Sequence, residues 1–206
     1  MTMTLTPEAF AAALRKAEAY LAAADPALAA AVAGPLPAEH YRREPFAALL
    51  RALIGQQLST RAAASIAGRL LALTGEPPTP QAVLAIDAAA LRACGLSAAK
   101  VRSVQAAARA VQEGALDLPA LAAQAEADIT AALTALPGVG PWTAHMVLMF
   151  GLGRLDVFAP ADLGLRRAIQ RLDGLTDLPS PAASLERAER WRPYRTVAAW
   201  QLWRWR

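Results

Sequence analysis

Residues 129–148 read ITAALTALPGVGPWTAHMVL, a helix–loop–helix pattern with a glycine on either side of a valine. The first helix is predicted to end at Leu136, before a proline and a glycine that do not continue a helix well. Pro141 begins the second helix, because its ring fixes φ near the helical value and its missing N–H costs nothing there. Gly138 and Gly140 allow left-handed backbone angles and close approach of another backbone. The stretch therefore predicts a tight hairpin between two helices.

The loop of this hairpin also suits an anion. The first amides of a helix have no partner within the helix and lie at the positive end of its dipole. A DNA phosphate could be held there, so the candidate DNA contacts in the hairpin are Gly138, Val139, Gly140 and Thr143. For a Gly-x-Gly pattern alone, an ordinary tight turn without a ligand is the alternative interpretation.

Apolar residues at helical spacing dominate the chain on both sides of the hairpin, and no convincing alternating strand pattern is present. Thr6, Pro7 and Glu8 form a helix-start signal for the run that continues through Ala24. The prolines at 26, 35 and 37 predict a loop region. Further helices are predicted over residues 46–57, 60–73, 80–86, 87–93, 98–112, 119–123, 126–135 and 162–172. The pattern predicts an all-α protein of about ten short helices.

The composition excludes several classes of protein. With 206 residues, 55% hydrophobic and 18% charged, the chain can fill a core and is not intrinsically disordered. No uninterrupted apolar run of about 18 residues predicts a membrane span. The start, MTMTLTPEAF, has no secretory signal pattern. The single cysteine, Cys94, excludes an internal disulfide framework, a four-cysteine zinc site and a self-contained iron–sulfur cluster, so we expect a cytosolic protein.

The formal net charge of +4 is unevenly distributed. Residues 163–206 hold nine arginines against four acidic residues, a net of +5, whereas residues 1–162 hold 12 basic and 13 acidic residues, a net of −1. Only Lys16 and Lys100 are lysines, and the planar fork of arginine suits phosphate recognition. The base composition of a genome explains an arginine-rich chain equally well, so the charge by itself assigns no partner.

Four segments of the chain resemble the helix–hairpin–helix superfamily of DNA glycosylases, in the same order and spacing. They are LIGQQLS at 53–59, LPGVGPWTA at 136–144, DVFAPADLG at 156–164 and WRPYRTVAAW at 191–200. The last is similar to the C-terminal helix of the alkylation-repair branch, DNA-3-methyladenine glycosylase II. The resemblance covers about residues 40–206 and is to a short form without the N-terminal β-rich domain of longer members.

This resemblance implies an all-α fold of two helical lobes with the active-site cleft between them, within a single domain of residues 1–206. Lobe 1 is expected to comprise about residues 1–44 and 163–206. Lobe 2 is expected to comprise about residues 45–162, including the hairpin at 129–150.

Asp162 matches the catalytic carboxylate of the family. Cleavage of an N-glycosidic bond builds positive charge at C1′ of the sugar, and a carboxylate stabilises that charge. The same group can orient or deprotonate the attacking water. From the sequence alone, the alternative is an acidic helix cap supported by Arg166 one turn later. Asp156, the nearby acidic residue, is interpreted as a solvated loop residue.

Trp142 stands where the strand-cleaving branch of the family has a lysine that attacks C1′. Because an indole cannot form a Schiff base, the resemblance implies a monofunctional glycosylase that uses water and has no AP-lyase activity. Trp142 and Trp203 match pocket tryptophans whose rings could stack on a positively charged methylated purine. Met146 and Leu163 complete the expected base pocket, at positions where the family often has tyrosine.

Base excision requires the target nucleotide to leave the duplex, and a side chain then fills the gap. Gln57 matches the gap-filling position of the family, and Gln56 is the neighbouring candidate. A polar helix end is the alternative interpretation of both glutamines. Four arginines are candidate contacts to flanking phosphates: Arg166, Arg167, Arg192 and Arg195. Ion pairs on the protein surface are the alternative interpretation of these side chains.

No catalytic metal or other cofactor is expected. Family members hold a monovalent sodium or potassium ion on main-chain carbonyls of the hairpin, and the matching carbonyls here are those of Thr134, Leu136 and Val139. Such ligands leave no side-chain signature.

The expected function is removal of alkylated bases such as 3-methyladenine and 7-methylguanine from damaged double-stranded DNA, by a monomer in the cytoplasm that associates with the nucleoid. One alternative is a non-catalytic helix–hairpin–helix module that only binds DNA, in which Asp162 is a helix cap. Another is a glycosylase of the same fold for deaminated or oxidised bases. Neutral bases need more help to leave, and the sequence offers no obvious acid for that step.

Overall fold

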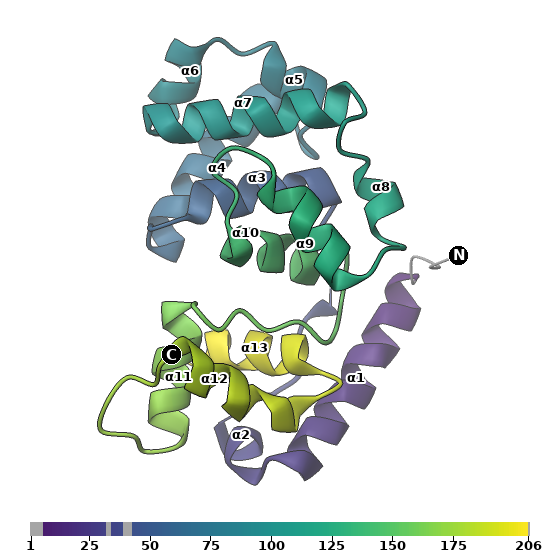
Figure 1. Cartoon of the computed structure of the whole chain (residues 1–206), viewed down its shortest axis with the longest axis vertical. Helices are drawn as coiled ribbons and strands as arrows, with labels where there is room; N and C mark the ends of the chain where they lie inside the picture. Colours follow the sequence, from purple (N-terminus) through teal and green to yellow (C-terminus); the bar gives the residue numbers. More distant parts are fainter. Residues whose placement is uncertain (1–5, 32–33, 39–42, 206) are drawn as a thin grey trace. The chain divides into compact units, whose positions relative to one another are not determined.

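The computed structural model describes residues 6–31, 34–38 and 43–205, in which there are thirteen α-helices and no strand (Figure 1). The all-α expectation is confirmed. The helices divide into two compact units. Unit 1 is Arg43–Leu152, and unit 2 combines the described residues before Arg43 with those from Gly153 onward. In the described residues, no helix is both long enough and apolar enough to cross a membrane.

Unit 1 contains α3 (Pro45–Gly55), α4 (Thr60–Thr74), α5 (Pro80–Leu84), α6 (Ala88–Ala93), α7 (Ala98–Gln112), α8 (Leu118–Leu121), α9 (Glu126–Thr134), α10 (Pro141–Met146) and the π-helical turn η2 (Val147–Gly151). Unit 2 contains α1 (Pro7–Ala24), α2 (Pro26–Ala31), α11 (Leu163–Leu172), α12 (Pro181–Ala188), the 3₁₀ turn η3 (Glu189–Trp191) and α13 (Arg195–Arg204). The helices predicted from apolar spacing are all present, with ends that differ from the predicted ones by at most two residues.

Several helices begin where a side chain caps the first turn. The hydroxyl of Thr6 accepts a hydrogen bond from N of Ala9 at 3.2 Å, and that of Ser59 accepts one from N of Ala62 at 3.3 Å. These contacts satisfy amides that the helix itself leaves unpaired. The helix-start signal that begins at Thr6 is therefore the one that the backbone uses.

One helix, α2, lies where the prolines predicted a loop. It begins at Pro26, and Asp25 caps it by accepting a hydrogen bond from N of Leu28 at 3.3 Å. Asp25 is only 2% exposed. Pro26 thus occupies the first turn of a helix, the one place where proline costs nothing, instead of ending an element.

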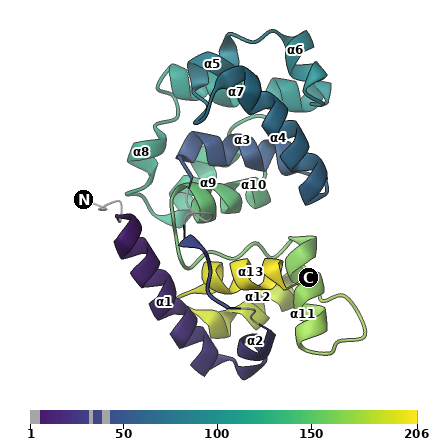
Figure 2. The ribbon, with the colours of Figure 1, turned by 180° about the vertical axis from the view of Figure 1, so that it is seen from behind.

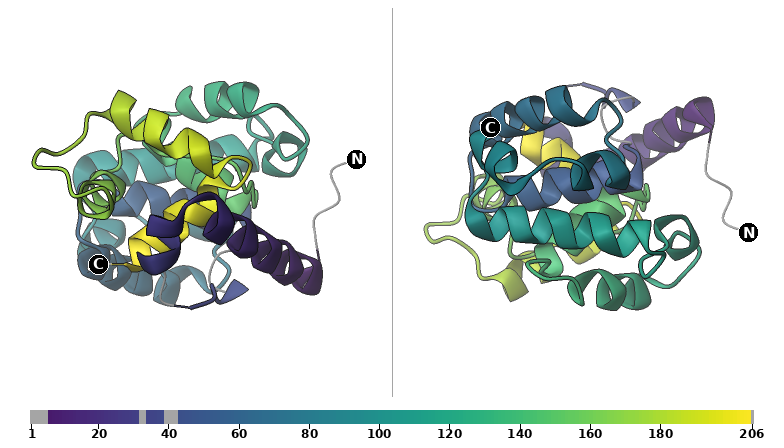
Figure 3. Two further views of the ribbon diagram at one scale, coloured as in Figure 1. Left: turned by 90° about the horizontal axis from the view of Figure 1, so that it is seen from below. Right: turned by 90° about the horizontal axis from the view of Figure 1, so that it is seen from above.

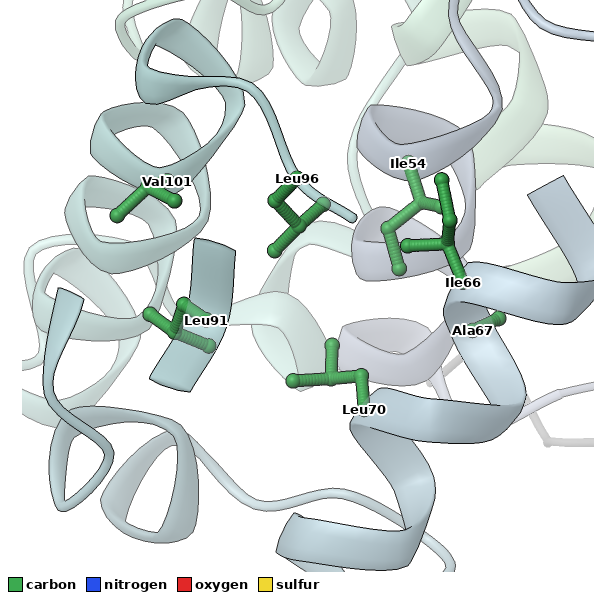
Figure 4. Packing of buried hydrophobic residues seen from close by; sticks show 7 residues of the cluster. All are labelled: Ile54, Ile66, Ala67, Leu70, Leu91, Leu96 and Val101. Carbon is green, nitrogen blue, oxygen red and sulfur yellow. The ribbon is translucent and has the colours of Figure 1, made fainter. Parts of the chain in front are cut away.

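The core of unit 1 is built around α3, which packs against α4 (Figure 2) and against α7. The view from above shows α7 lengthwise (Figure 3, right). Buried side chains from α3, α4, α6, α7 and the loop between α6 and α7 form one cluster at the C-terminal end of α3 (Figure 4). Its members are Ile54, Ile66, Ala67, Leu70, Leu91, Leu96 and Val101. This packing fixes the end of α3, where the two glutamines of the sequence motif follow.

In unit 2, α13 packs against α1, α2 and α11. Trp200 of α13 is fully buried and meets Phe10 of α1 edge-on, with ring centroids 6.3 Å apart. The crossing of α1 and α13 is visible from below (Figure 3, left). The C-terminal helix is therefore anchored over most of its length, which fixes the position of Trp203 near its end.

Residues 153–162 belong to unit 2, although the sequence placed them in lobe 2. N of Val157 donates to Oγ1 of Thr196 at 2.9 Å, and that hydroxyl donates in turn to O of Val157 at 3.1 Å. Both residues are buried. This pairing ties the segment to α13, so the boundary between the units falls after Leu152 instead of after Asp162.

Candidate active site

Asp162 stands immediately before α11 and caps it. Its Oδ1 accepts a hydrogen bond from N of Leu165 at 2.8 Å, which satisfies an amide of the first turn. The same oxygen accepts a second hydrogen bond, from Nε1 of Trp203 at 3.0 Å. Helix capping requires only the first of these contacts. The second holds the carboxylate against an indole from α13.

Gly164 leaves the space in which these two side chains meet. A Cβ at this position would lie 3.0 Å from Oδ1 of Asp162 and 3.3 Å from Cδ1 of Trp203. Both separations are tighter than ordinary van der Waals contact. The φ angle of Gly164 does not lie in the left-handed region, so glycine is needed here for space and not for backbone conformation.

The four residues of the expected base pocket form two pairs. Trp203 and Leu163 lie in unit 2, where Leu163 follows Asp162 directly and is 47% exposed. Trp142 and Met146 lie one turn apart on α10 of unit 1. Trp142 is half-buried, whereas Met146 is 7% exposed and presents little surface to a ligand. The indole is therefore the member of the second pair that can stack on a base.

The hairpin between α9 and α10 needs glycine at one position. Gly138 has a φ of 78°, and a Cβ there would collide with Oγ of Ser103 on α7. Gly140 has a φ of −104° and precedes α10, and a Cβ there meets nothing within 4 Å. Of the two glycines, which both allow a left-handed backbone angle, Gly138 adopts one and Gly140 does not.

Two of the candidate DNA contacts in the hairpin have buried side chains. Val139 is 7% exposed and Thr143 is 1% exposed. The hydroxyl of Thr143 accepts a hydrogen bond from Nε2 of Gln56 at 2.8 Å. These side chains stabilise unit 1 and do not reach outward, which leaves the main chain of the hairpin as its candidate DNA-binding group.

Gln56 and Gln57 differ in environment. Gln56 follows α3, and its Nε2 also donates to O of Gly138 at 2.9 Å, so it joins the end of α3 to the hairpin. Gln57 is exposed and has a φ of 58°, the one positive φ among the described non-glycine residues. Of the two glutamines, Gln57 is therefore the one whose side chain is presented to solvent.

Sequence patterns assign Lys100 no role. Its Nζ donates to O of Ile54 at 2.6 Å and to O of Gln56 at 2.7 Å. These carbonyls lie at the C-terminal end of α3, where a helix leaves acceptors unpaired and its dipole favours a cation. Burial lowers the pKa of Lys100. The signal that could have found it is a lysine in a chain that otherwise uses arginine almost throughout.

Asp156 and Arg195 form an ion pair, which corrects the interpretation of Asp156. Arg195 is 7% exposed, and its Nε donates to Oδ1 of Asp156 at 2.8 Å. Nη1 of Arg195 donates to Glu189 at 3.1 Å, and Arg192 pairs with Asp156 at 2.8 Å. Asp156 is therefore an ion-pair partner and not a solvated loop residue. Arg195 is held at the start of α13 by these pairs, and its contact to a DNA phosphate stays a prediction.

Arg166 is also partly engaged within unit 2. Its Nε donates to O of Pro179 at 2.7 Å, and its side chain is half-buried. The adjacent Arg167 is exposed on α11. Of these two arginines, Arg167 is the more accessible to a phosphate.

The described residues contain no group of three or more His, Cys, Asp or Glu side chains that could hold a metal ion. A hairpin cation would depend on main-chain oxygens instead. O of Leu136 accepts a hydrogen bond from N of Val139 at 3.1 Å. A carbonyl oxygen has a second lone pair, so this contact is compatible with an additional ligand.

A buried ionic network lies elsewhere in unit 2. Asp25 accepts hydrogen bonds from Nε1 of Trp191 at 2.8 Å and from Arg187 at 2.7 Å, and Arg187 also pairs with Asp173. Burial opposes ionisation of Asp25, but the hydrogen bonds from Trp191 and Arg187 outweigh it and hold its pKa below the usual value. The network ties α2 to α11 and α12, and therefore stabilises the unit that carries Asp162.

Residues 50–193 match the family model described as HhH-GPD superfamily base excision DNA repair protein. DNA-3-methyladenine glycosylase 1 of Schizosaccharomyces pombe is 35% identical over 166 residues, which cover 79% of this chain and 73% of the yeast protein. DNA-3-methyladenine glycosylase 2 of Escherichia coli is 34% identical over 164 residues, which cover 75% of this chain and 55% of the bacterial protein.

A solved structure of the Schizosaccharomyces pombe 3-methyladenine DNA glycosylase in complex with abasic DNA is similar to this chain, with a TM-score of 0.85 and 33% identity. The match covers 92% of this chain and 95% of that one. A DNA-3-methyladenine glycosidase from Bacillus halodurans matches with a TM-score of 0.72 and 34% identity, over 91% of this chain and 88% of that one. This chain therefore belongs to the HhH-GPD superfamily of base excision DNA repair proteins.

Proposed function

We propose that this protein is a monofunctional DNA glycosylase that hydrolyses the N-glycosidic bond of alkylated bases in double-stranded DNA. The hydrogen bond from Trp203 to Asp162 carries the proposal, because a helix cap alone does not require it. The relatives that are named 3-methyladenine glycosylases support this substrate class.

The damaged nucleotide must leave the stack before its glycosidic bond can be reached. Gln57 is the proposed gap-filling residue, because it is exposed and lies on a turn at the end of α3. Trp142 is proposed to stack on the extruded base. A 3-methyladenine or 7-methylguanine ring carries delocalised positive charge, which the face of an indole attracts.

Asp162 is proposed as the catalytic residue. As the bond between C1′ and the base breaks, the base keeps the bonding electrons and positive charge grows on the sugar. The carboxylate stabilises that charge, and a water molecule adds to C1′ and gives its proton to Asp162 or to solvent. A methylated purine is cationic before cleavage and leaves as a neutral base, so no acid is needed to protonate it.

The side chain at position 142 argues against strand cleavage. A lyase forms a Schiff base with C1′ through an amine, and an indole nitrogen cannot supply one. Lys100, in the same unit, donates its Nζ hydrogens to the carbonyls of Ile54 and Gln56 at the C-terminal end of α3. We therefore expect no product of borohydride reduction that links enzyme and DNA.

DNA is proposed to be held by the main chain of the hairpin around Gly138 and by Arg167 on α11. A monovalent cation on the carbonyls of Thr134, Leu136 and Val139 would add positive charge at the hairpin. The expected site of action is the nucleoid in the cytoplasm, where chromosomal DNA is found.

The proposal is tested by incubating the protein with duplexes that carry 3-methyladenine, 7-methylguanine, hypoxanthine or 8-oxoguanine and measuring the free base by chromatography. Release of the two methylated bases, and little of the neutral ones, supports it. DNA binding without release of any base would favour the non-catalytic module. Preferential release of hypoxanthine or 8-oxoguanine would change the substrate class.

A further inference from the structure

We propose that Lys100 is a positioning residue for base flipping, which holds the turn after α3 so that Gln57 is presented to the DNA. The inference rests on the proposed function, in which Gln57 fills the gap left by the extruded nucleotide. No substrate contact is assigned to Lys100 itself.

The turn after α3 has a backbone that needs support. Gln57 has a φ of 58°, a left-handed conformation that is unfavourable for a residue with a Cβ. N of Leu58 donates to O of Gly55 at 3.2 Å, which closes the turn around Gln57. A conformation of this kind persists when neighbouring contacts determine it.

Lys100 provides such contacts on both sides of the bend. Its ammonium group bonds to O of Ile54 within the last turn of α3 and to O of Gln56 just before Gln57. The ammonium is a compact charge with three donors, so it can bond two carbonyls that point in different directions. The peptide that links Gln56 to Gln57 is thereby fixed to α7.

The same face of α7 also supports the hairpin. Ser103 lies one turn after Lys100, and the α-carbon of Gly138 packs so closely on it that no Cβ fits between them. Gln56 completes the connection through its hydrogen bonds to Gly138 and Thr143. α7 therefore sets the position of the gap-filling turn relative to the hairpin, the two loops of unit 1 proposed to contact DNA.

Four variants test the inference: Lys100→Met, Gln57→Ala, the double variant, and Lys16→Met as a control. Lys16 is exposed on α1 of unit 2 and is the one other lysine of the chain. Base release from a methylated duplex is measured under single-turnover conditions. Insertion of Gln57 is followed separately by the fluorescence of 2-aminopurine next to a tetrahydrofuran abasic analogue, which requires binding but no hydrolysis.

We expect Lys100→Met to release base roughly ten- to a hundredfold more slowly than the wild type, because a small misplacement of a positioned group has an effect of this size. Its fluorescence response should resemble that of Gln57→Ala. The double variant should be no slower than Gln57→Ala, since Lys100 acts through Gln57. Lys16→Met should match the wild type in both measurements.

Base release by Lys100→Met within twofold of the wild-type rate, or losses that multiply in the double variant, would overturn the inference. If Lys100→Met does not fold, Lys100→Arg replaces it, since a planar guanidinium keeps the charge but does not reproduce the geometry of the ammonium. Lys100→Arg is then expected to release base more slowly than the wild type, by a smaller factor than that expected for Lys100→Met. It should cause no further slowing when combined with Gln57→Ala. A wild-type rate and fluorescence response in Lys100→Arg would overturn the inference. A wild-type protein that binds the abasic duplex but releases no base refutes the proposed function, while the fluorescence comparison still decides the role of Lys100.

Discussion

Trp203 donates its indole hydrogen bond to the same oxygen of Asp162 that caps α11, at 3.0 Å, across the space that Gly164 leaves. Two donors from different helices thus converge on one carboxylate oxygen. Because α13 is anchored by buried contacts and α11 packs against it, the orientation of this carboxylate is set before any substrate arrives. Such preorganisation is what charge stabilisation at a sugar carbon requires.

Replacement of Gly164 by alanine should impair catalysis without impairing folding. The new methyl group would lie 3.0 Å from Oδ1 of Asp162, so the pair with Trp203 must shift. We expect single-turnover base release to fall at least about tenfold, since misplacement of a positioned group is costly. Gly68→Ala on α4 is the matched control, because nothing lies within 4 Å of its added Cβ. The melting temperature and base release together separate the two variants, and equal base release by both would contradict the role given to Gly164.

Trp203→Phe tests the hydrogen bond apart from the aromatic surface. Phenylalanine keeps a ring but has no N–H donor, so Oδ1 of Asp162 loses one partner. We expect a slower rate of base release at saturating enzyme and a nearly unchanged Kd for abasic duplex. Trp205→Phe is the control, since Trp205 is also half-buried but packs under Arg171 at 4.4 Å. A raised Kd with an unchanged rate of base release would mean that Trp203 contributes to DNA binding and not to catalysis.

Trp142→Ala should weaken the recognition of positively charged bases more than the recognition of neutral bases. A cation–π contact contributes about 0.5–2 kcal/mol, which corresponds to a change of up to about thirtyfold in KM for a methylated base. Trp142→Phe should lose less than Trp142→Ala, because a benzene face still attracts a cation, although more weakly than an indole does. Comparison of 7-methylguanine with neutral hypoxanthine shows whether charge matters: equal losses for both bases would indicate stacking alone.

The two glycines of the hairpin should differ sharply in their tolerance of alanine. Gly138→Ala places a Cβ against Ser103 in a left-handed conformation, which costs at least about 1–2 kcal/mol of stability before any steric conflict. Gly140 has an extended backbone, and an added Cβ would meet nothing within 4 Å. Gly140→Ala should therefore change the free energy of unfolding little. Urea denaturation of both variants checks this contrast, and similar losses would show that the hairpin depends on Gly140 in another way.

Removal of Asp25 should destabilise unit 2 and reduce its sensitivity to acid. Asp25→Asn breaks a buried ion pair, for which a loss of about 3 kcal/mol is expected, since Asp173 still accompanies Arg187. The lowered pKa of Asp25 means that its contribution is present above the ordinary value of 3.8 and is lost as the pH falls through the lower folded value. The difference in unfolding free energy between wild type and variant should therefore shrink below about pH 4. A difference independent of pH would show that the charge of Asp25 is not what stabilises the network.

The sequence predicted those features that depend on local chemistry. The cap at Thr6 and the apolar spacing of the helices are local features, and the helices follow them closely. The helix α2 was missed because Pro26 can end one element or begin another, and the buried partners of Asp25 decide between these outcomes. Those partners, Trp191 and Arg187, lie more than 160 positions away in the sequence, which no local pattern indicates.

Within the candidate site, single residues could be identified but their partners could not. Asp162 and Trp203 were both chosen from the resemblance, yet their hydrogen bond depends on how α11 and α13 pack. The ion pairs of Arg195 could not be predicted, because charge alone does not show which arginines are paired inside the protein. Lys100 was passed over for a related reason: its acceptors are carbonyls, which carry no sequence signal.

The most direct test of the central claim compares wild-type protein with Asp162→Asn on a duplex that contains 3-methyladenine. Asparagine has nearly the same shape and can still accept hydrogen bonds from Leu165 and Trp203 through its carbonyl oxygen, but it has no negative charge. Free 3-methyladenine is measured under single-turnover conditions, and binding to abasic duplex is measured in parallel. If Asp162 is the catalytic carboxylate, the variant binds DNA as the wild type does and releases base at least about a hundredfold more slowly. Equal rates of release would show that Asp162 only caps α11.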